Sequence, residues 1–143
     1  MTTKRALRFL IADDHPTMRQ TIVQILRDEW PDALCTEVPD GAALLTRATH
    51  ARFDLVISDV SMPHLSGLEA LKALKTLEPH LPVLLVSIND HERYALRALR
   101  NGAAGFLPKW LLDQALVKAV RTALDGKRYI SVELATKLAT ASL

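Results

Sequence analysis

Short apolar runs alternate along the chain with longer segments in which apolar residues recur every three or four positions. The short runs are typical of strands buried on both faces of a sheet, and the longer segments are typical of amphipathic helices. The predicted strands are residues 7–12, 33–38, 55–59, 83–87 and 104–107. The predicted helices are residues 16–30, 41–48, 68–77, 91–100 and 112–124. This alternation predicts a parallel sheet between two layers of helices.

Residue types near the helix ends refine these boundaries. Pro16 suits an early position of the first helix, so Asp14 is predicted to be its N-cap. Asp113 is predicted to cap or precede the helix at 112–124. After Gly126 the alternation stops, and residues 131–143 are predicted to form a short amphipathic helix.

Chemically active side chains stand where four of the predicted strands end. Asp13 and Asp14 follow the first strand, Asp59 ends the third, Ser87 ends the fourth and Lys109 follows the fifth. Ligands of open α/β sheets bind beyond the carboxyl ends of the strands, so we expect these groups to meet in one crevice. Three carboxylates in one crevice repel one another unless a cation lies between them, and Mg²⁺ prefers such oxygen ligands. The ammonium and the hydroxyl suit a phosphate, and a carboxylate beside them could attack phosphorus.

Composition narrows the class of protein only modestly. The chain has 143 residues, of which 49% are hydrophobic and 24% charged, as in an ordinary single globular domain. Its net charge of +2 is spread along the chain and does not by itself favour nucleic-acid binding. The single cysteine excludes an internal disulfide framework and fits a reducing cytoplasm. The sequence shows no signal peptide or membrane span, and we expect a cytoplasmic protein without a membrane partner.

Four sequence pieces together resemble a known family. They are Ile11-Ala12-Asp13-Asp14-His15-Pro16, Ser58-Asp59-Val60-Ser61-Met62-Pro63, Ser87, and Gly102-Ala103-Ala104-Gly105-Phe106-Leu107-Pro108-Lys109. In this order at strand ends, they resemble the receiver domain of bacterial two-component response regulators over about the first 125 residues. The resemblance implies a flavodoxin-like three-layer sandwich with strand order 2-1-3-4-5 and five helices, followed by a short C-terminal linker helix.

The same resemblance implies a role for each residue of the crevice. Asp59 would be the phospho-acceptor, and Mg²⁺ would be held by Asp14, Asp59 and the backbone carbonyl of Ser61. Asp13 would act on the metal through a water. Ser87 and Lys109 would bind the phosphoryl group, and Phe106 would be the aromatic switch residue that turns inward when Ser87 moves.

The implied function is a Mg²⁺-dependent signalling switch that a sensor histidine kinase phosphorylates and that relays its state through the fourth and fifth helices. Such a protein is not an enzyme beyond its own phosphotransfer and dephosphorylation, and it could form a homodimer.

The C-terminal part of the chain resembles one subfamily, whose members carry a C-terminal LuxR-type helix-turn-helix. The resemblance lies in the run Gly126-Lys127-Arg128-Tyr129-Ile130-Ser131-Val132-Glu133-Leu134-Ala135. We therefore predict a receiver domain over 1–125, with a linker and the start of a connector helix over 126–143. DNA would be bound only through an output domain absent from this sequence. A natural stand-alone receiver is the alternative.

Three positions depart from the family pattern. Ile88 stands where the family usually has Ala or Gly, so it is predicted to modulate access to the phosphate. Phe106 lacks a tyrosine hydroxyl, and Trp110 follows Lys109 where a proline or small polar residue is expected. Ile88 and Phe106 would also fit a phosphorylation-independent adaptor. An aspartate-nucleophile phosphatase would place a second Asp where this chain has Ser61.

Several of these residues also have structural explanations. Taken singly, Phe106 fits a core position and Ser87 fits a loop hydroxyl. His15 and His91 could form a metal pair, although a solvated histidine at a helix start is more common. The stripe Arg93, Arg97 and Arg100 fits a solvated helix face as well as a contact surface.

Overall fold

The computed structural model describes residues 5–88 and 92–141, which form one parallel sheet covered by helices. The strands are β1 (Arg8–Ala12), β2 (Leu34–Val38), β3 (Leu55–Asp59), β4 (Val83–Ser87) and β5 (Gly105–Pro108). Their order in the sheet is β2-β1-β3-β4-β5, and every pair is parallel. Both the strand positions and the predicted order are confirmed.

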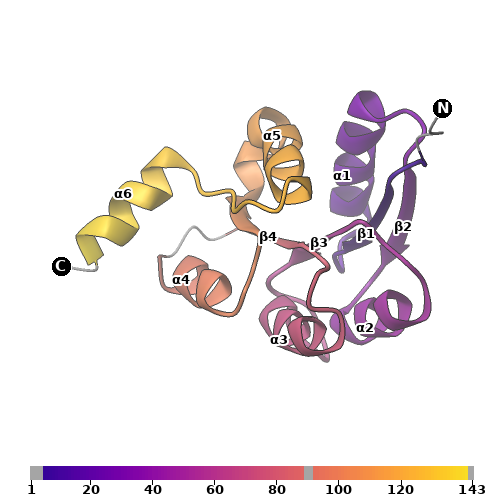
Figure 1. Cartoon of the computed structure of the whole chain (residues 1–143), viewed down its shortest axis with the longest axis horizontal. Coiled ribbons are helices and arrows are strands. Elements are labelled where there is room, and N and C mark those ends of the chain that lie inside the picture. The colour runs from indigo at the N-terminus through magenta and orange to yellow at the C-terminus, as the bar shows by residue number, and fades with distance from the viewer. Residues whose placement is uncertain (1–4, 89–91, 142–143) are drawn as a thin grey trace.

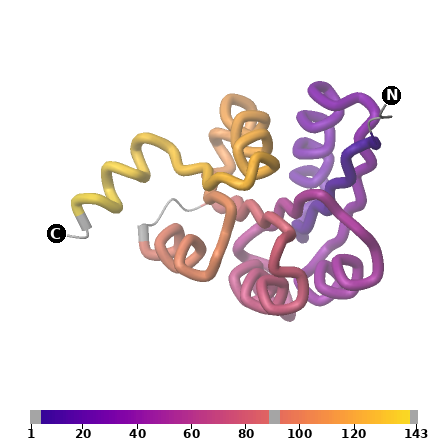
Figure 2. The backbone as a smooth tube through the Cα atoms, viewed as in Figure 1, coloured from indigo at the N-terminus to yellow at the C-terminus, as the bar shows by residue number. Residues whose placement is uncertain are grey.

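Helices occupy both faces of this sheet. They are α1 (Pro16–Glu29), α2 (Gly41–His50), α3 (Gly67–Leu77), α4 (Glu92–Arg100), α5 (Leu112–Leu124) and α6 (Val132–Ala141). α1 and α5 cover one face, whereas α2, α3 and α4 cover the other (Figure 1). α6 extends outward from these layers, beyond the β5 edge of the sheet (Figure 2). The predicted three-layer sandwich with an additional C-terminal helix is therefore confirmed.

The apolar runs are continuous because both faces of each central strand are buried. Along β1, Phe9 and Ile11 point to the cluster packed against α1 and α5. Leu10 and Ala12 point to the cluster packed against α2 and α3. Successive side chains of a strand face opposite ways, so one apolar run contributes to two cores.

Two of the predicted helix starts are wrong in detail. α1 has His15 as its N-cap without a side-chain cap, and the Asp14 carboxylate lies beside the His15 ring instead. The chain before α5 forms a 3₁₀ turn, η1 (Lys109–Leu111), so the cap is Leu111. Asp113 consequently lies in the first turn of α5, where its negative charge interacts favourably with the positive end of the helix dipole.

α6 packs against the sheet domain through its apolar side. Tyr129 forms a single bridge with Gly105 of β5, and a Cβ at Gly105 would lie 2.7 Å from the Tyr129 carbonyl oxygen. Only glycine therefore lets this segment approach β5. Leu134 then joins the α2–α4 core cluster, and the Ser131 hydroxyl caps the helix by accepting from the Leu134 amide at 3.1 Å. Within the described residues, no helix is long and apolar enough to cross a membrane.

Leu134→Ala should lower the free energy of unfolding by about 2–4 kcal/mol, because Leu134 is only 7% exposed and its removal leaves a cavity. Val132→Ala on the same helix is the control, since Val132 is 84% exposed and should change stability by less than about 0.5 kcal/mol. Urea unfolding measures both variants. Equal stability of the two variants would show that α6 is not docked in solution.

Candidate functional site

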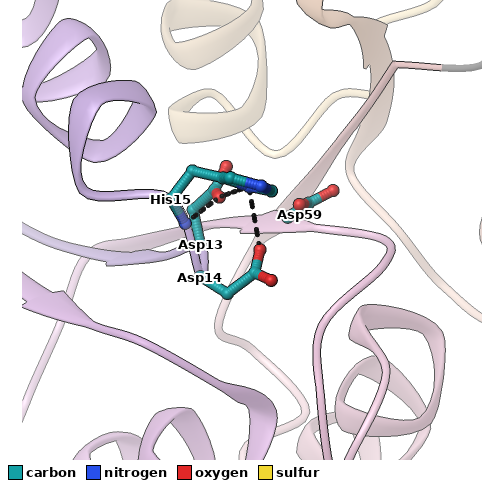
Figure 3. A group of neighbouring side chains, drawn as sticks. All are labelled: Asp13, Asp14, His15 and Asp59. Carbon is teal, nitrogen blue, oxygen red and sulfur yellow. Dashed lines mark hydrogen bonds and ion pairs between the residues drawn. The ribbon is translucent and has the colours of Figure 1, made fainter.

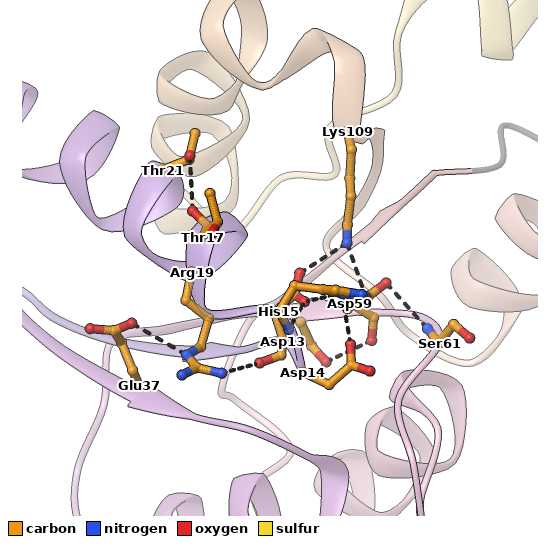
Figure 4. A network of polar contacts seen from close by, with 11 residues as sticks. Asp13, Asp14, His15, Thr17, Arg19, Thr21, Glu37, Asp59, Ser61 and Lys109 are labelled. Atoms are coloured by element: carbon orange, nitrogen blue, oxygen red, sulfur yellow. Dashed lines mark hydrogen bonds and ion pairs between the residues drawn. The ribbon is translucent and has the colours of Figure 1, made fainter.

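One buried ammonium joins two buried carboxylates at the carboxyl edge of the sheet. Lys109 Nζ lies 2.9 Å from Asp13 Oδ2 and 3.1 Å from Asp59 Oδ2 (Figure 4). The Lys109 side chain is 7% exposed, and both carboxylates are buried. Asp13 follows β1, Asp59 ends β3 and Lys109 follows β5. These three strand ends lie at the same edge of the sheet, as predicted.

Asp59 ends β3, the central strand, and its carboxylate is held by two donors. Oδ1 accepts a hydrogen bond from the Ser61 amide at 3.2 Å, and Oδ2 contacts Lys109. Burial raises the pKa of Asp59, and the charge of Asp13 adds to this, although Lys109 and the Ser61 amide act in the opposite direction. The carboxylate is consequently less stabilised as an anion than an exposed one.

Lys109 experiences the opposite balance. Burial alone would lower the pKa of the Lys109 ammonium, but the hydrogen bond to Asp13 and the charges of Asp59 and Asp13 outweigh it and raise the pKa. Lys109 is therefore a firmly charged cation at neutral pH.

The acidic pair after β1 brings a histidine into the site. The His15 amide donates to Asp13 Oδ1 at 2.8 Å, and His15 Nδ1 lies 3.3 Å from the same oxygen. Nδ1 also lies 3.0 Å from Asp14 Oδ1. Figure 3 shows the ring between the acidic pair and Asp59. One ligand atom from each of Asp13, Asp14, His15 and Asp59 lies within 4.8 Å of the others.

Arg19 fixes the loop that carries this pair. Its Nη1 donates to the Asp13 carbonyl oxygen at 2.6 Å, and its Nε lies 3.3 Å from Glu37 Oε1. The β1 loop, α1 and β2 are thus tied together (Figure 4). No local sequence pattern indicates this role, because an arginine in a helix near acidic residues is most often solvated.

The loop after Asp59 folds back tightly on the end of β3. The Gly67 amide donates to the Val60 carbonyl oxygen at 2.8 Å, and a Cβ at Gly67 would lie 2.0 Å from the Asp59 carbonyl oxygen. A side chain at position 67 would therefore displace the loop that presents Ser61 to Asp59.

A cleft of about 570 Å³ opens beside the acidic group. Among the predicted site residues it is lined by Asp14, Asp59, Ser61, Ser87, Ile88 and Lys109. Ser87 is buried at the end of β4, whereas Ile88 is 68% exposed at the mouth of the cleft. The predicted position of Ile88 beside the site is therefore observed, whereas its effect on access stays a prediction.

Most of the remaining predicted residues lie away from the cleft or outside the described part of the chain, and Arg97 is the exception. Phe106 is buried in the core cluster that also contains Leu134, and it does not line the cleft. Trp110 is exposed on η1. Arg97 lines the cleft, and Arg93 and Arg100 are exposed on the same helix. His91 lies outside the described residues, so the pairing of His15 with His91 is not tested.

The donor set fits a hard divalent cation. Asp13, Asp14 and Asp59 bring three carboxylates, and Lys109 brings an ammonium that contacts Asp13 and Asp59. Three carboxylates and one ammonium leave two negative charges in excess, and one divalent ion would balance them. Carboxylate oxygens this close together are the ligands that Mg²⁺ prefers.

Comparisons with known proteins agree with this geometry. The sequence profile of the family described as "Response regulator receiver domain" matches residues 9–138. The response regulator GacA of Pseudomonas viridiflava is 33% identical over 136 residues, which cover 95% of this chain and 64% of GacA. The chain thus spans less than two thirds of the length of this relative.

Solved structures give the same result. The signal receiver domain of NarL from Mycobacterium tuberculosis is 32% identical and superposes with a TM-score of 0.79, covering 87% of this chain and all of that one (100%). A LuxR-family two-component response regulator from Aurantimonas sp. shares the fold, with a TM-score of 0.89 at 24% identity over 96% of this chain and 99% of that one. From the family profile and these relatives, the chain belongs to the receiver domain family of two-component response regulators.

Proposed function

We propose that this receiver domain is a Mg²⁺-dependent switch that a sensor histidine kinase phosphorylates on Asp59. The observation that carries the proposal is the position of Asp59. It is a buried carboxylate at the end of the central strand, in contact with Lys109 and open to the cleft that Asp14 and Ser87 also line. A nucleophile, a phosphate-binding cation and metal-binding carboxylates therefore face one volume.

In the proposed reaction, an Asp59 carboxylate oxygen attacks the phosphorus of the donor. The bond from phosphorus to the donor nitrogen or oxygen breaks, and its electron pair leaves with the donor. The Ser61 amide orients the attacking carboxylate, and incomplete solvation of Asp59 makes it more reactive. Lys109 and Ser87 would bind the transferred phosphoryl oxygens. Mg²⁺, held by Asp14, Asp59 and the Ser61 carbonyl with Asp13 acting through a water, would neutralise negative charge on that group.

The proposed output runs through β5 towards α6. Phe106 lies three residues before Lys109 and belongs to the same buried cluster as Leu134 of α6. A change at Lys109 or Ser87 that repositions Phe106 would therefore alter the packing of α4 and α6. We propose that α6 continues into a DNA-binding output domain that controls transcription. The additional length of GacA supports this, because 36% of GacA lies outside the match.

Two other functions make different predictions about the same site. A phosphorylation-independent adaptor would not bind a fluoride–beryllium phosphoryl mimic with Mg²⁺. A phosphatase needs a general acid after the nucleophile, and the cleft offers the Ser61 hydroxyl at that position instead. Stable binding of the mimic without turnover of small phosphate esters would support the switch over both alternatives.

Asp59→Asn should abolish incorporation of phosphate from acetyl phosphate, because it removes the nucleophile. Intact-protein mass spectrometry measures the phosphoryl group, with Asp32→Asn as a control at an exposed carboxylate. Incorporation in the wild type should also require Mg²⁺, and Asp14→Asn should weaken Mg²⁺ binding. Phosphate incorporation by Asp59→Asn at the wild-type level would disprove the assignment.

Asp59→Asn should also raise stability at neutral pH. The pKa of Asp59 is raised on folding, so the folded chain binds its proton more tightly and the ionised carboxylate costs stability. Each unit of elevation is worth about 1.4 kcal/mol. The advantage of the variant should shrink as the pH falls through the raised pKa and vanish below 3.8, the ordinary value. Urea unfolding from about pH 3, below the ordinary pKa of a carboxyl group, to about pH 8, well above it, measures this difference. A constant difference would contradict the prediction.

Ile88→Ala should speed both phosphorylation by small donors and loss of the phosphate by several-fold. The branched side chain lines the cleft, where it would obstruct the donor and the attacking water. Its 68% exposure keeps the stability change within about 0.5 kcal/mol. Val132→Ala, an exposed β-branched residue on α6, is the matched control. Unchanged rates in Ile88→Ala would show that the side chain does not restrict access.

A further inference from the structure

His15 stands at the metal-binding face of the site without a role in the proposed phosphotransfer. It follows the acidic pair directly and is the N-cap of α1, but its side chain makes no capping hydrogen bond. The side chain is 70% exposed, yet the ring contacts both carboxylates (Figure 3). Neither the helix nor the core requires an imidazole here, so its contacts with Asp13 and Asp14 are the feature to explain.

The spacing of these contacts matches the edges of a metal coordination shell. Around an octahedral ion with bonds of about 2.1 Å, adjacent ligand atoms lie about 3.0 Å apart and opposite ones about 4.2 Å. His15 Nδ1 lies 3.0 Å from Asp14 Oδ1 and 3.3 Å from Asp13 Oδ1. The whole set, with Asp59, fits within 4.8 Å. Small adjustments would therefore give one ion oxygens of Asp14 and Asp59 and the imidazole nitrogen of His15, with Asp13 within reach through a water.

Nδ1 and two carboxylate oxygens cannot lie this close as three bare acceptors. Either a proton on Nδ1 or a cation between the atoms must separate their lone pairs. We infer that a bound metal ion lies between these atoms and that His15 becomes one of its ligands. The inference rests on the proposed metal site and adds that this site prefers metal ions that bind imidazole nitrogen. Imidazole nitrogen suits Ni²⁺, Co²⁺ and Zn²⁺, whereas Mg²⁺ gains little from it.

The test compares Ni²⁺ and Mg²⁺ binding to the whole chain by calorimetry, with Co²⁺ absorption as a spectroscopic signature of the nitrogen ligand. His15→Asn keeps an amide donor to the carboxylates but removes the imidazole, and His15→Phe removes both. His50→Asn is the control, because His50 lies on α2 and its Nδ1 contacts the Thr46 carbonyl oxygen. Unfolding midpoints establish that each variant is folded.

Both His15 variants should lose Ni²⁺ affinity by roughly tenfold or more and change the Co²⁺ spectrum, which is the scale expected for a metal-site residue. Their Mg²⁺ affinity should stay within about threefold, since Mg²⁺ relies on the oxygens. Unchanged Ni²⁺ affinity, or equal losses for Ni²⁺ and Mg²⁺, would overturn the role of His15. If the proposed metal site itself is wrong, Asp14→Asn will leave Mg²⁺ binding unchanged. That result distinguishes failure of the metal site from failure of the inference about His15.

Discussion

The contact of Lys109 with Asp13 and Asp59 is the interaction on which the rest of the site depends. Asp13 and Asp59 come from loops and strands 96 and 50 residues away from Lys109 in sequence. All three charged groups are buried, so each would be strongly unfavourable alone. The positive charge of Lys109 lowers the cost of burying the Asp13 and Asp59 carboxylates, but a single charge does not neutralise both. The cluster is therefore poorly explained by stability and well explained by a need for reactive carboxylates beside a cation.

The sheet is what makes such a cluster possible. β3 lies between β1 and β4, and β5 follows at the edge, so four strand ends supply Asp13, Asp59, Ser87 and Lys109 to one place. Continuous apolar runs bury β3 and β4 on both faces, and the polar side chains of these two strands lie at their carboxyl ends. The absence of a side chain at Gly67 lets the loop close onto Asp59. Packing thus decides where the charges meet, and the charges decide what the site can do.

This division explains what the sequence could and could not predict. Strands, helices and the meeting of the strand ends follow from local periodicity and one topological rule, and the structure has them as expected. The prediction that Asp14 caps α1 was wrong because the Asp14 carboxylate contacts the His15 ring instead, and no local sequence pattern indicates this contact. The contact of Arg19 with Asp13 and the docking of Leu134 depend on segments brought together only by the fold. Side-chain partners across the fold were therefore least accessible to sequence reasoning.

The charge excess also links stability to function. The raised pKa of Asp59 indicates that the fold holds this carboxylate at a cost, because burial disfavours its charge. A divalent cation or a proton relieves the cost, but a proton also removes the nucleophile. On the proposed function, only the cation relieves the repulsion while keeping Asp59 ionised and Lys109 available to a phosphoryl group. The same excess of carboxylates that weakens the bare fold is then the reason that the site requires a metal to react.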